Sequence, residues 1–492
     1  MPPLPPNLSR TGIIRTTPSW NQRTMSLRNT HIRHISSRFP SEPSCDTGWV
    51  NPSLPPGAAR LAIPKMATAN PRPIFCKHVW ELVDTLPLKS DPGNTVPFTL
   101  SLAKDVNVMT VGYPAESSGV GLVRTYEFDG MTKSFVQKGQ DLNYAGANEY
   151  AAGTGAAVTA DGSVVLVGIP SELTGSPTPH KANGLAIAYL YDGATTWNST
   201  GSVMYYVPEA TDRFYGYSVA YSGFSTATSR WYSTAGVPGA NTLFLNAQDS
   251  DGIWQADIGT TGALIGVGGA VGTGRFGAAS DVSDLTGGAG SYLYTIAGAP
   301  GQDGNDDSYF RIARATEDGD GPWTPWTAVY DSYTDFGPVT GTLGTSVAMV
   351  ADGTLVIAGD PTNGNVYVYS STTGNPSTWS RLGPVIQSEH IGTRFGQSVG
   401  VDRDASGTST QGTTIVVGEP DFNAPGRPLS GRVVVLEYIE TTWHRVLNGV
   451  NGTAENEHFG ETVAMVASDR FAAAGNRDSG RVAVYTSSGD LN

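Results

Sequence analysis

The tripeptide Gly-x-Pro, preceded by an apolar or β-branched run, recurs along this chain at intervals of roughly 56 to 68 residues. Its copies are MTVGYP ending at Pro114, VLVGIP at Pro170, STAGVP at Pro238, TIAGAP at Pro300, VIAGDP at Pro361 and VVGEP at Pro420. A seventh copy, AAAGNR around Gly475, lacks the proline. A period of this length is near the long end of propeller-blade repeats, so this feature constrains the fold more than any other.

Each unit repeats more than the tripeptide. An FG-S-V element stands about twenty residues before most copies, as FYGYSVA from Phe214, FGAAS from Phe276, LGTSVAMV from Leu343, FGQSVGV from Phe395 and FGETVAMV from Phe459. A strand such as NVYVY or RVAVY follows the tripeptide, and then a strand marked by Trp197, Trp254, Trp326, Trp379 or Trp443. Four short strands separated by Gly, Asn, Asp and Ser turns predict one antiparallel blade per unit.

The two ends of the repeat region predict how the ring closes. The last unit ends after Tyr485 without a Trp strand, whereas an unpaired one, HVWELVDTL, precedes the first unit from His78 to Leu86. Phe135 stands where the first unit would carry Trp. We therefore predict an all-β fold, a seven-bladed propeller over residues 75–492, in which the Trp80 strand completes the last blade.

Residues 1–74 are predicted to form a separate extension. The first forty residues contain six arginines but no Asp, Glu or Lys. This composition is typical of an organellar transit peptide, and equally of a disordered tail that precedes a true start at Met25 or Met66. The two cysteines, Cys45 and Cys76, lie upstream of the repeats, so no disulfide framework holds the blades; pairing between them would need an oxidising compartment.

Charge and hydropathy exclude two classes of partner. The net charge of −14 argues against nucleic acid, which requires clustered Lys and Arg. No apolar run reaches the 18 residues of a membrane span. The acidity suits solubility or cation binding.

The repeated motifs resemble the FG-GAP family, whose blade pattern is roughly FGxSVA, a loop, a strand ending in GAP, and then GxVYVY. FGAASDVSDLTGGAGSYLYTIAGAP is the best match, and the resemblance covers about residues 95–492. It implies a seven-bladed propeller like the integrin α head, which binds ligands and Ca²⁺. It also implies adhesion or surface assembly, and favours an extracellular or cell-surface location.

The resemblance also implies where calcium would bind. The Ca²⁺ loop of the family reads DxDxDG after FGxSV, and here only DRDASG approaches it, with Asp402, Asp404 and Ser406 as the candidate metal ligands. The alternative interpretation of this segment is a solvated turn. The acidic turns at 249–252, 303–307 and 317–321 have the same two interpretations.

No motif for catalysis is found in the repeats. The histidines lack metal-ligand spacing, no GxSxG elbow stands between a strand and a helix, and no Trp is preceded by the Asp-box of sialidases. We therefore predict that the chain is not an enzyme and has no cofactor other than the calcium implied by the resemblance. It would be a platform that binds a protein or a glycan through long loops at 171–184 and 421–431. A lectin-like propeller is the alternative, with Trp197, Trp379 and Trp443 as sugar-contact candidates unless they only pack between blades, and a glycoside hydrolase is a more remote one.

Overall fold

The chain divides after residue 73 into two units, and every residue that the structure describes belongs to the second, Ile74–Asn492. The computed structural model describes residues 80–87, 99–103, 107–114, 120–143, 151–170, 184–205, 214–222, 230–248, 254–255, 263–265, 275–284, 292–301, 307–316, 326–336, 339–371, 378–402, 410, 412–466, 470–474 and 481–487. The predicted N-terminal extension, Cys45 and Cys76 lie outside these residues.

The described residues form seven antiparallel sheets, each with four main strands. The innermost strands are β2 (Thr99–Leu102), β6 (Gly155–Val158), β10 (Val219–Tyr221), β15 (Ala279–Val282), β20 (Ser346–Met349), β25 (Val399–Asp402) and β29 (Thr462–Val466). The second strands are β3 (Val108–Tyr113), β7 (Val164–Ile169), β11 (Trp231–Val237), β16 (Tyr292–Ala299), β21 (Leu355–Asp360), β26 (Thr414–Glu419) and β30 (Arg470–Ala474). The third strands are β4 (Leu122–Asp129), β8 (Leu185–Tyr191), β12 (Thr242–Gln248), β17 (Asp307–Thr316), β22 (Asn365–Ser371), β27 (Arg432–Ile439) and β31 (Arg481–Ser487).

The outermost strands carry most of the aromatic markers found in the sequence. They are β5 (Ser134–Gln137), β9 (Trp197–Tyr205), β13 (Trp254–Gln255), β18 (Thr327–Asp331), β23 (Trp379–Arg381), β28 (Thr442–Asn451) and β1 (Trp80–Pro87). The short strands β14 (Ala263–Ile265), β19 (Val339–Thr340) and β24 (Ile386–Gln387) extend three of the sheets. Helical structure in these ranges is limited to α1 (Ser332–Phe336) and a 3₁₀ turn, η2 (Pro238–Ala240), and no helix there has the length and apolarity needed to cross a membrane.

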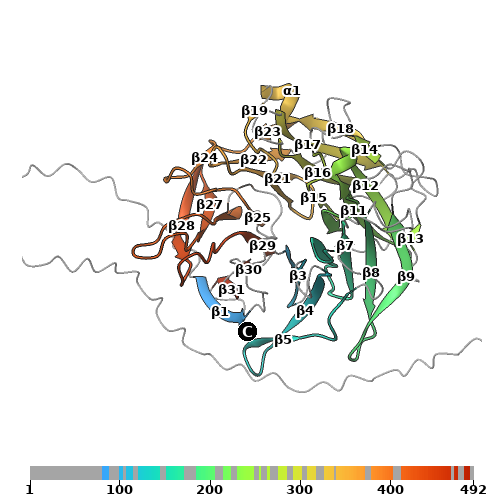
Figure 1. Cartoon of the computed structure of the whole chain (residues 1–492). Coiled ribbons are helices and arrows are strands. Elements are labelled where there is room, and N and C mark those ends of the chain that lie inside the picture. The colour runs from blue at the N-terminus through green and yellow to red at the C-terminus, as the bar shows by residue number, and fades with distance from the viewer. Residues whose placement is uncertain are drawn as a thin grey trace, which may run out of the picture. The chain divides into compact units, whose positions relative to one another are not determined.

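The innermost strands contact one another in sequence order, and β29 contacts β2, so the sheets follow one another around a closed ring. Figure 1 shows the sheets arranged in this way, with the chain running round the ring from blue to red. The prediction of an all-β propeller is therefore confirmed. The sequence pattern predicts four-stranded sheets, and a single such sheet cannot bury both of its faces. The sheets therefore pack against one another around a ring.

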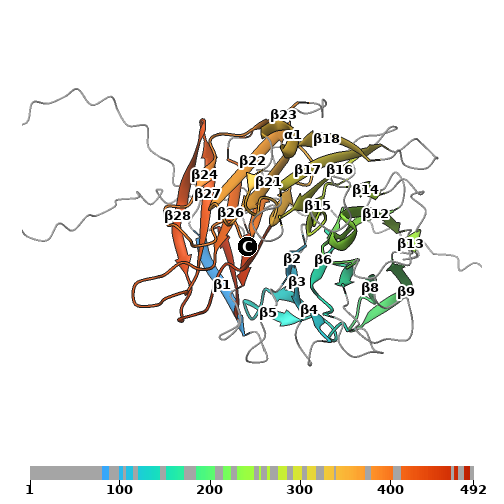
Figure 2. The ribbon, with the colours of Figure 1, turned by 45° about the horizontal axis from the view of Figure 1, so that its top comes forward.

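Strand β1 closes the ring as the sequence predicted. It pairs antiparallel with β31, with Trp80 opposite Ser487 and Pro87 opposite Arg481, and so supplies the outermost strand of the last sheet. Figures 1 and 2 both show blue β1 beside the red C-terminal strands. The pairing covers an edge of β31 that would otherwise expose unpaired backbone groups.

The core lies between the sheets rather than at one centre. Side chains alternate along each second strand, so Ile415 and Val417 of β26 pack against the sheet before it, while Val416 packs against the sheet after it. Because both faces are covered, β3, β7, β21 and β26 are buried at every position. This explains why their sequences are mainly apolar and do not alternate between apolar and polar residues.

A contact between two glycines explains why both repeated motifs are needed. A Cβ at Gly359, the first residue of GDP, would lie 2.0 Å from the carbonyl oxygen of Gly396, the glycine of the FG motif in the next sheet. Gly396 has φ +90° and donates its N–H to Gly418 of its own sheet at 3.0 Å. The hydroxyl of Ser346 also donates to the Gly396 carbonyl, at 2.8 Å. A Cβ would likewise lie about 2 Å from a glycine carbonyl oxygen of the next sheet at Gly112, Gly168, Gly236, Gly298 and Gly418. Gly-x-Pro and FG-S are therefore two halves of one joint between blades.

Candidate functional site

The innermost strands of all seven sheets line a central channel with a cavity of about 470 Å³. Asp281 of β15 is a carboxylate in this wall, and its oxygens accept hydrogen bonds from the N–H groups of Met349 and Val282, both at 2.8 Å. Burial raises the pKa of Asp281 to about 6, although these two hydrogen bonds oppose the change. The other lining side chains are mostly small, apolar or hydroxyl-bearing.

A second, smaller pocket of about 330 Å³, which we call the mouth pocket, is lined by turns that carry the two repeated motifs. Its lining residues are Tyr217, Arg275, Ala278, Pro300, Gly301, Thr342, Thr345, Pro361, Thr362, Arg394 and Gln397. Arg275, Thr342 and Arg394 each directly precede the aromatic or leucine of an FG motif. The repeat therefore brings equivalent positions of neighbouring sheets to one pocket.

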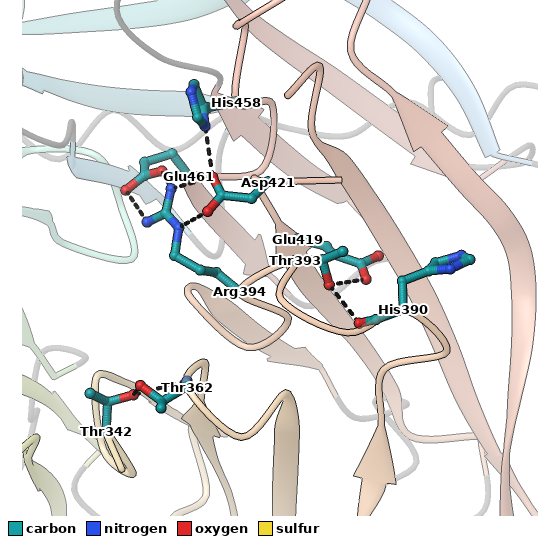
Figure 3. Close-up of polar contacts among 9 residues, drawn as sticks. All are labelled: Thr342, Thr362, His390, Thr393, Arg394, Glu419, Asp421, His458 and Glu461. Atoms are coloured by element: carbon teal, nitrogen blue, oxygen red, sulfur yellow. Dashed lines mark hydrogen bonds and ion pairs between the residues drawn. The ribbon is translucent and has the colours of Figure 1, made fainter. Parts of the chain in front are cut away.

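Arg394 is at the centre of a cluster of four charged or titratable side chains beside this pocket (Figure 3). Its guanidinium binds both oxygens of Asp421, at 2.7 and 2.9 Å, and both oxygens of Glu461, at 2.8 and 3.2 Å. His458 Nδ1 lies 2.8 Å from Asp421 Oδ1. Burial works against ionisation of Asp421, but the hydrogen bonds to His458 and Arg394 outweigh it and hold its pKa below the ordinary range. The cluster is therefore a closed ion-pair network that joins the last two sheets.

A second network orders the segment 388–393, which joins β24 to the next FG motif. Glu419 is fully buried and accepts hydrogen bonds from Ser388 at 2.7 Å and Thr393 at 2.5 Å. Arg432 forms a buried ion pair with the same carboxylate. Between these two anchors the side chain of Ile391 is fully exposed, at 105% relative accessibility. The network thus holds a short loop in one conformation and presents an apolar tip to solvent.

The long loop at 421–431, which the sequence predicted as a contact segment, lies next to this tip. It is internally ordered: Asn423 accepts from the N–H of Leu429 at 2.7 Å, and Gly431 donates to the carbonyl of Phe422 at 3.0 Å. The Phe422 ring packs between His390, at 5.1 Å, and the Arg432 guanidinium, at 4.0 Å. The other predicted contact loop, 171–184, lies outside the described residues except for Gly184.

The tryptophans proposed as sugar contacts pack at the joints between sheets. Trp197 is 2% exposed and donates to the carbonyl of Lys138 in the preceding sheet at 2.7 Å. Trp443 donates to the carbonyl of Leu382 at 3.1 Å, and a Cβ at Gly383 would lie 3.1 Å from its ring nitrogen. Trp379 packs edge-on against Tyr294 of the preceding sheet. Trp197 is buried, whereas Trp379 and Trp443 are half-buried. These positions favour the packing interpretation, because an indole face that packs against a neighbouring sheet is not available to a sugar ring.

The predicted calcium ligands are only partly described. Asp402, at the end of β25, is 8% exposed, whereas Asp404 and Ser406 lie outside the described residues. Among the residues that are described, no group of three or more His, Cys, Asp or Glu side chains has metal-binding geometry. Calcium at Asp402, Asp404 and Ser406 stays a prediction.

Comparison with known proteins adds little beyond the architecture. Neither a protein-family model nor a curated protein sequence matches the chain. Among solved structures it is similar to a protein described as a 6-phosphogluconolactonase from Bacteroides uniformis, with 13% identity over 78% of this chain and 96% of that chain and a TM-score of 0.43. Hydrazine synthase of Kuenenia stuttgartiensis has 13% identity over 81% and 96% of the two chains and a TM-score of 0.44. The Dos1 propeller has 9% identity over 82% and 95%, and a TM-score of 0.39. Likenesses of this size say nothing of what the chain binds.

Sequence reasoning missed the Arg394 cluster and the mouth pocket. The members of the cluster, Arg394, Asp421, His458 and Glu461, are far apart along the chain and match no metal or catalytic motif. One signal was available: Arg275, Arg394 and His458 all occupy the position just before an FG phenylalanine. Equivalent positions in a closed repeat lie on one rim, so cationic or titratable side chains there would have pointed to a common site.

Proposed function

We propose that this chain is a seven-bladed propeller of the FG-GAP kind and that it works as a non-catalytic platform for a protein partner. Seven sheets that follow one another around a closed ring support the blade count. The glycine joint and the Ser hydroxyl bond to it give the FGxS and Gly-x-Pro motifs one shared structural role. A rigid ring with loops at its rim is suited to presenting contacts.

The observation that carries the proposal is that Ile391 is fully exposed on a loop whose two ends, Ser388 and Thr393, are hydrogen-bonded to the buried Glu419. Leaving an isoleucine in water forgoes roughly 1.5–3 kcal/mol of burial free energy. Anchoring the loop through the Glu419–Arg432 pair also costs desolvation of two charges. A partner that buries Ile391 would gain from an apolar contact already held in one conformation, without the entropy cost of ordering the loop.

The charged groups nearby support a binding role rather than catalysis. Asp421 and Glu461 share one guanidinium, and the lowered pKa of Asp421 makes that carboxyl a poor general acid.

Calcium at the loop containing Asp402, Asp404 and Ser406 is a separate part of the proposal. Calorimetric titration with Ca²⁺ should show saturable binding that Asp404→Ala abolishes, and a flat titration would make this segment a solvated turn.

The experiment that tests the platform uses the full chain as bait in three forms: wild type, Ile391→Asp and Met131→Asp. Met131 is 94% exposed on the β4–β5 turn of another sheet and so controls for loss of any apolar surface residue. A partner identified by cross-linking should be retained by wild type and by Met131→Asp. Its affinity, measured with the purified partner, should fall about 10- to 100-fold in Ile391→Asp.

Equal affinity in all three forms would overturn the assignment of this surface. The melting curves of the two variants should match wild type, because exposed substitutions rarely change stability by more than about 0.5 kcal/mol. A glycan array distinguishes the lectin-like alternative: binding of a glycan that Trp443→Ala abolishes, with no protein partner, would favour that function instead.

A further inference from the structure

We propose that the mouth pocket binds a small hydroxyl-rich molecule that carries one carboxylate or phosphate group, with Arg275 as the partner of that anion. This site is separate from the Ile391 surface, since neither Ile391 nor the loop at 421–431 is among the residues lining the pocket. The two proposals therefore stand or fall independently.

The charge of the pocket is opposite to that of the protein. The chain has a net charge of −14, yet no Asp or Glu is among the described residues that line the pocket, and its two charged lining residues are arginines. Arg394 already directs four of its five N–H donors to Asp421 and Glu461, and its charge is balanced by these two carboxylates. Arg275 makes no ion pair with a carboxylate in the part of the chain that is described, so one cationic group is left for a ligand.

Arg275 is also held in a position suited to an anion. Its guanidinium carbon lies 5.9 Å from the centroid of the Tyr217 ring, and both residues line the pocket. Its backbone φ of +46° is in the left-handed region, directly before the buried Phe276 and the glycine joint. An arginine placed by a rigid backbone and an aromatic neighbour loses less side-chain entropy on binding than a free surface arginine.

The rest of the lining predicts hydroxyl groups on the ligand. Thr342 and Thr362 are joined by a 2.8 Å hydroxyl contact, shown in Figure 3, and Thr345 donates to the Thr342 carbonyl at 2.7 Å. The Thr342 hydroxyl also accepts the N–H of Thr362 at 3.1 Å, so the Thr342–Thr362 pair retains both a free hydroxyl proton and a free lone pair for a ligand. The Gln397 amide and the Tyr217 hydroxyl add donors and acceptors. Pro300 and Pro361 provide an apolar surface for a carbon skeleton.

The volume limits the ligand to a small molecule. At about 330 Å³ the pocket is at the lower end of small-molecule sites, so it suits a ligand about the size of one sugar unit rather than a polymer. A carboxylate and a phosphate share the chemistry that Arg275 would recognise. The experiment therefore has to distinguish a carboxylate ligand from a phosphate ligand.

Calorimetric titration of the full chain tests the proposal with four probes: glucuronate, glucose 6-phosphate, inorganic phosphate and glucose. At least one of the two anionic sugars should bind at least tenfold more tightly than glucose and inorganic phosphate. Arg275→Gln should weaken that binding at least tenfold, whereas Arg381→Gln, which makes the same charge change at an exposed position of β23, should leave it unchanged. Tyr217→Phe provides a second variant of the pocket, and it should weaken binding less than Arg275→Gln.

The outcomes separate clearly. Binding of glucuronate alone assigns a carboxylate ligand, and binding of glucose 6-phosphate alone assigns a phosphate ligand. Inorganic phosphate binding as tightly as glucose 6-phosphate would overturn the hydroxyl-rich part of the proposal. No binding of either anionic sugar, or equal loss in Arg275→Gln and Arg381→Gln, would overturn it altogether.

Discussion

At the scale of single residues, the fold depends on glycines that a propensity scale would count against a strand. Gly359 lies within β21, where glycine adds flexibility and contributes no side chain to the core. Its value comes from the next sheet, whose Gly396 carbonyl occupies the space of a Cβ. The cost of glycine in the strand is therefore offset by close packing of two blades.

We expect Gly359→Ala to destabilise the propeller by about 2–4 kcal/mol, because the added methyl group can be accommodated only if two backbones separate. The matched control is Gly130→Ala, where a Cβ would have nothing within 4 Å. That variant should be neutral or stabilised by up to about 1 kcal/mol, through the unfolded state. Urea unfolding measures both free energies. Similar values for the two variants would show that the blade joint tolerates a methyl group.

The same residues show what the sequence could and could not predict. The spacing of Gly-x-Pro and FG predicted the strands, their order and the closure by the Trp80 strand, because these depend on local pattern and on counting. The contact between Gly359 and Gly396 could not be predicted, since it depends on the distance between two sheets. The mouth pocket was missed for the same reason: Tyr217, Arg275 and Arg394 come together only when the ring has closed.

At the scale of elements, the loop 388–393 depends on a carboxylate that lies in another strand. Glu419, at the end of β26, accepts hydrogen bonds from both ends of the loop and pairs with Arg432 of β27. A buried ion pair contributes little net stability when complete, but removal of one partner leaves an uncompensated charge. Removal of the Glu419 carboxylate should therefore destabilise both the loop 388–393 and the adjoining ends of β26 and β27.

Glu419→Gln should cost about 3–5 kcal/mol of unfolding free energy, because Arg432 would remain buried without its counter-charge. Glu389→Gln is the control: its carboxylate also pairs with an arginine, Arg445, at 3.1 Å, but is 62% exposed. An exposed pair of this kind contributes at most about 1 kcal/mol. Chemical denaturation of both variants checks this. A loss in Glu419→Gln no larger than in the control would mean that Glu419 does not anchor the loop.

At the scale of the whole molecule, the ring is closed by strands from opposite ends of the described chain. Each sheet contacts two neighbours around the circle, and β1 completes the last sheet by pairing with β31 while also contacting β5 of the first sheet. Stability in such a repeat is cooperative, because each interface is shared by two neighbours. Removal of β1 should therefore lower the stability of the whole ring, although the strand has only eight residues.

Two truncations test this closure directly. A chain beginning at residue 75 keeps β1 and should melt within a few degrees of the full chain. A chain beginning at residue 91 lacks β1 and leaves the edge of β31 unpaired, so it should melt much earlier or without a single cooperative transition, and it should self-associate through the exposed edge. Calorimetry and light scattering measure the two effects. If the shorter chain stayed monomeric with an unchanged melt, the last sheet would be stable with three strands, and β1 would be an accessory to the ring rather than its closure.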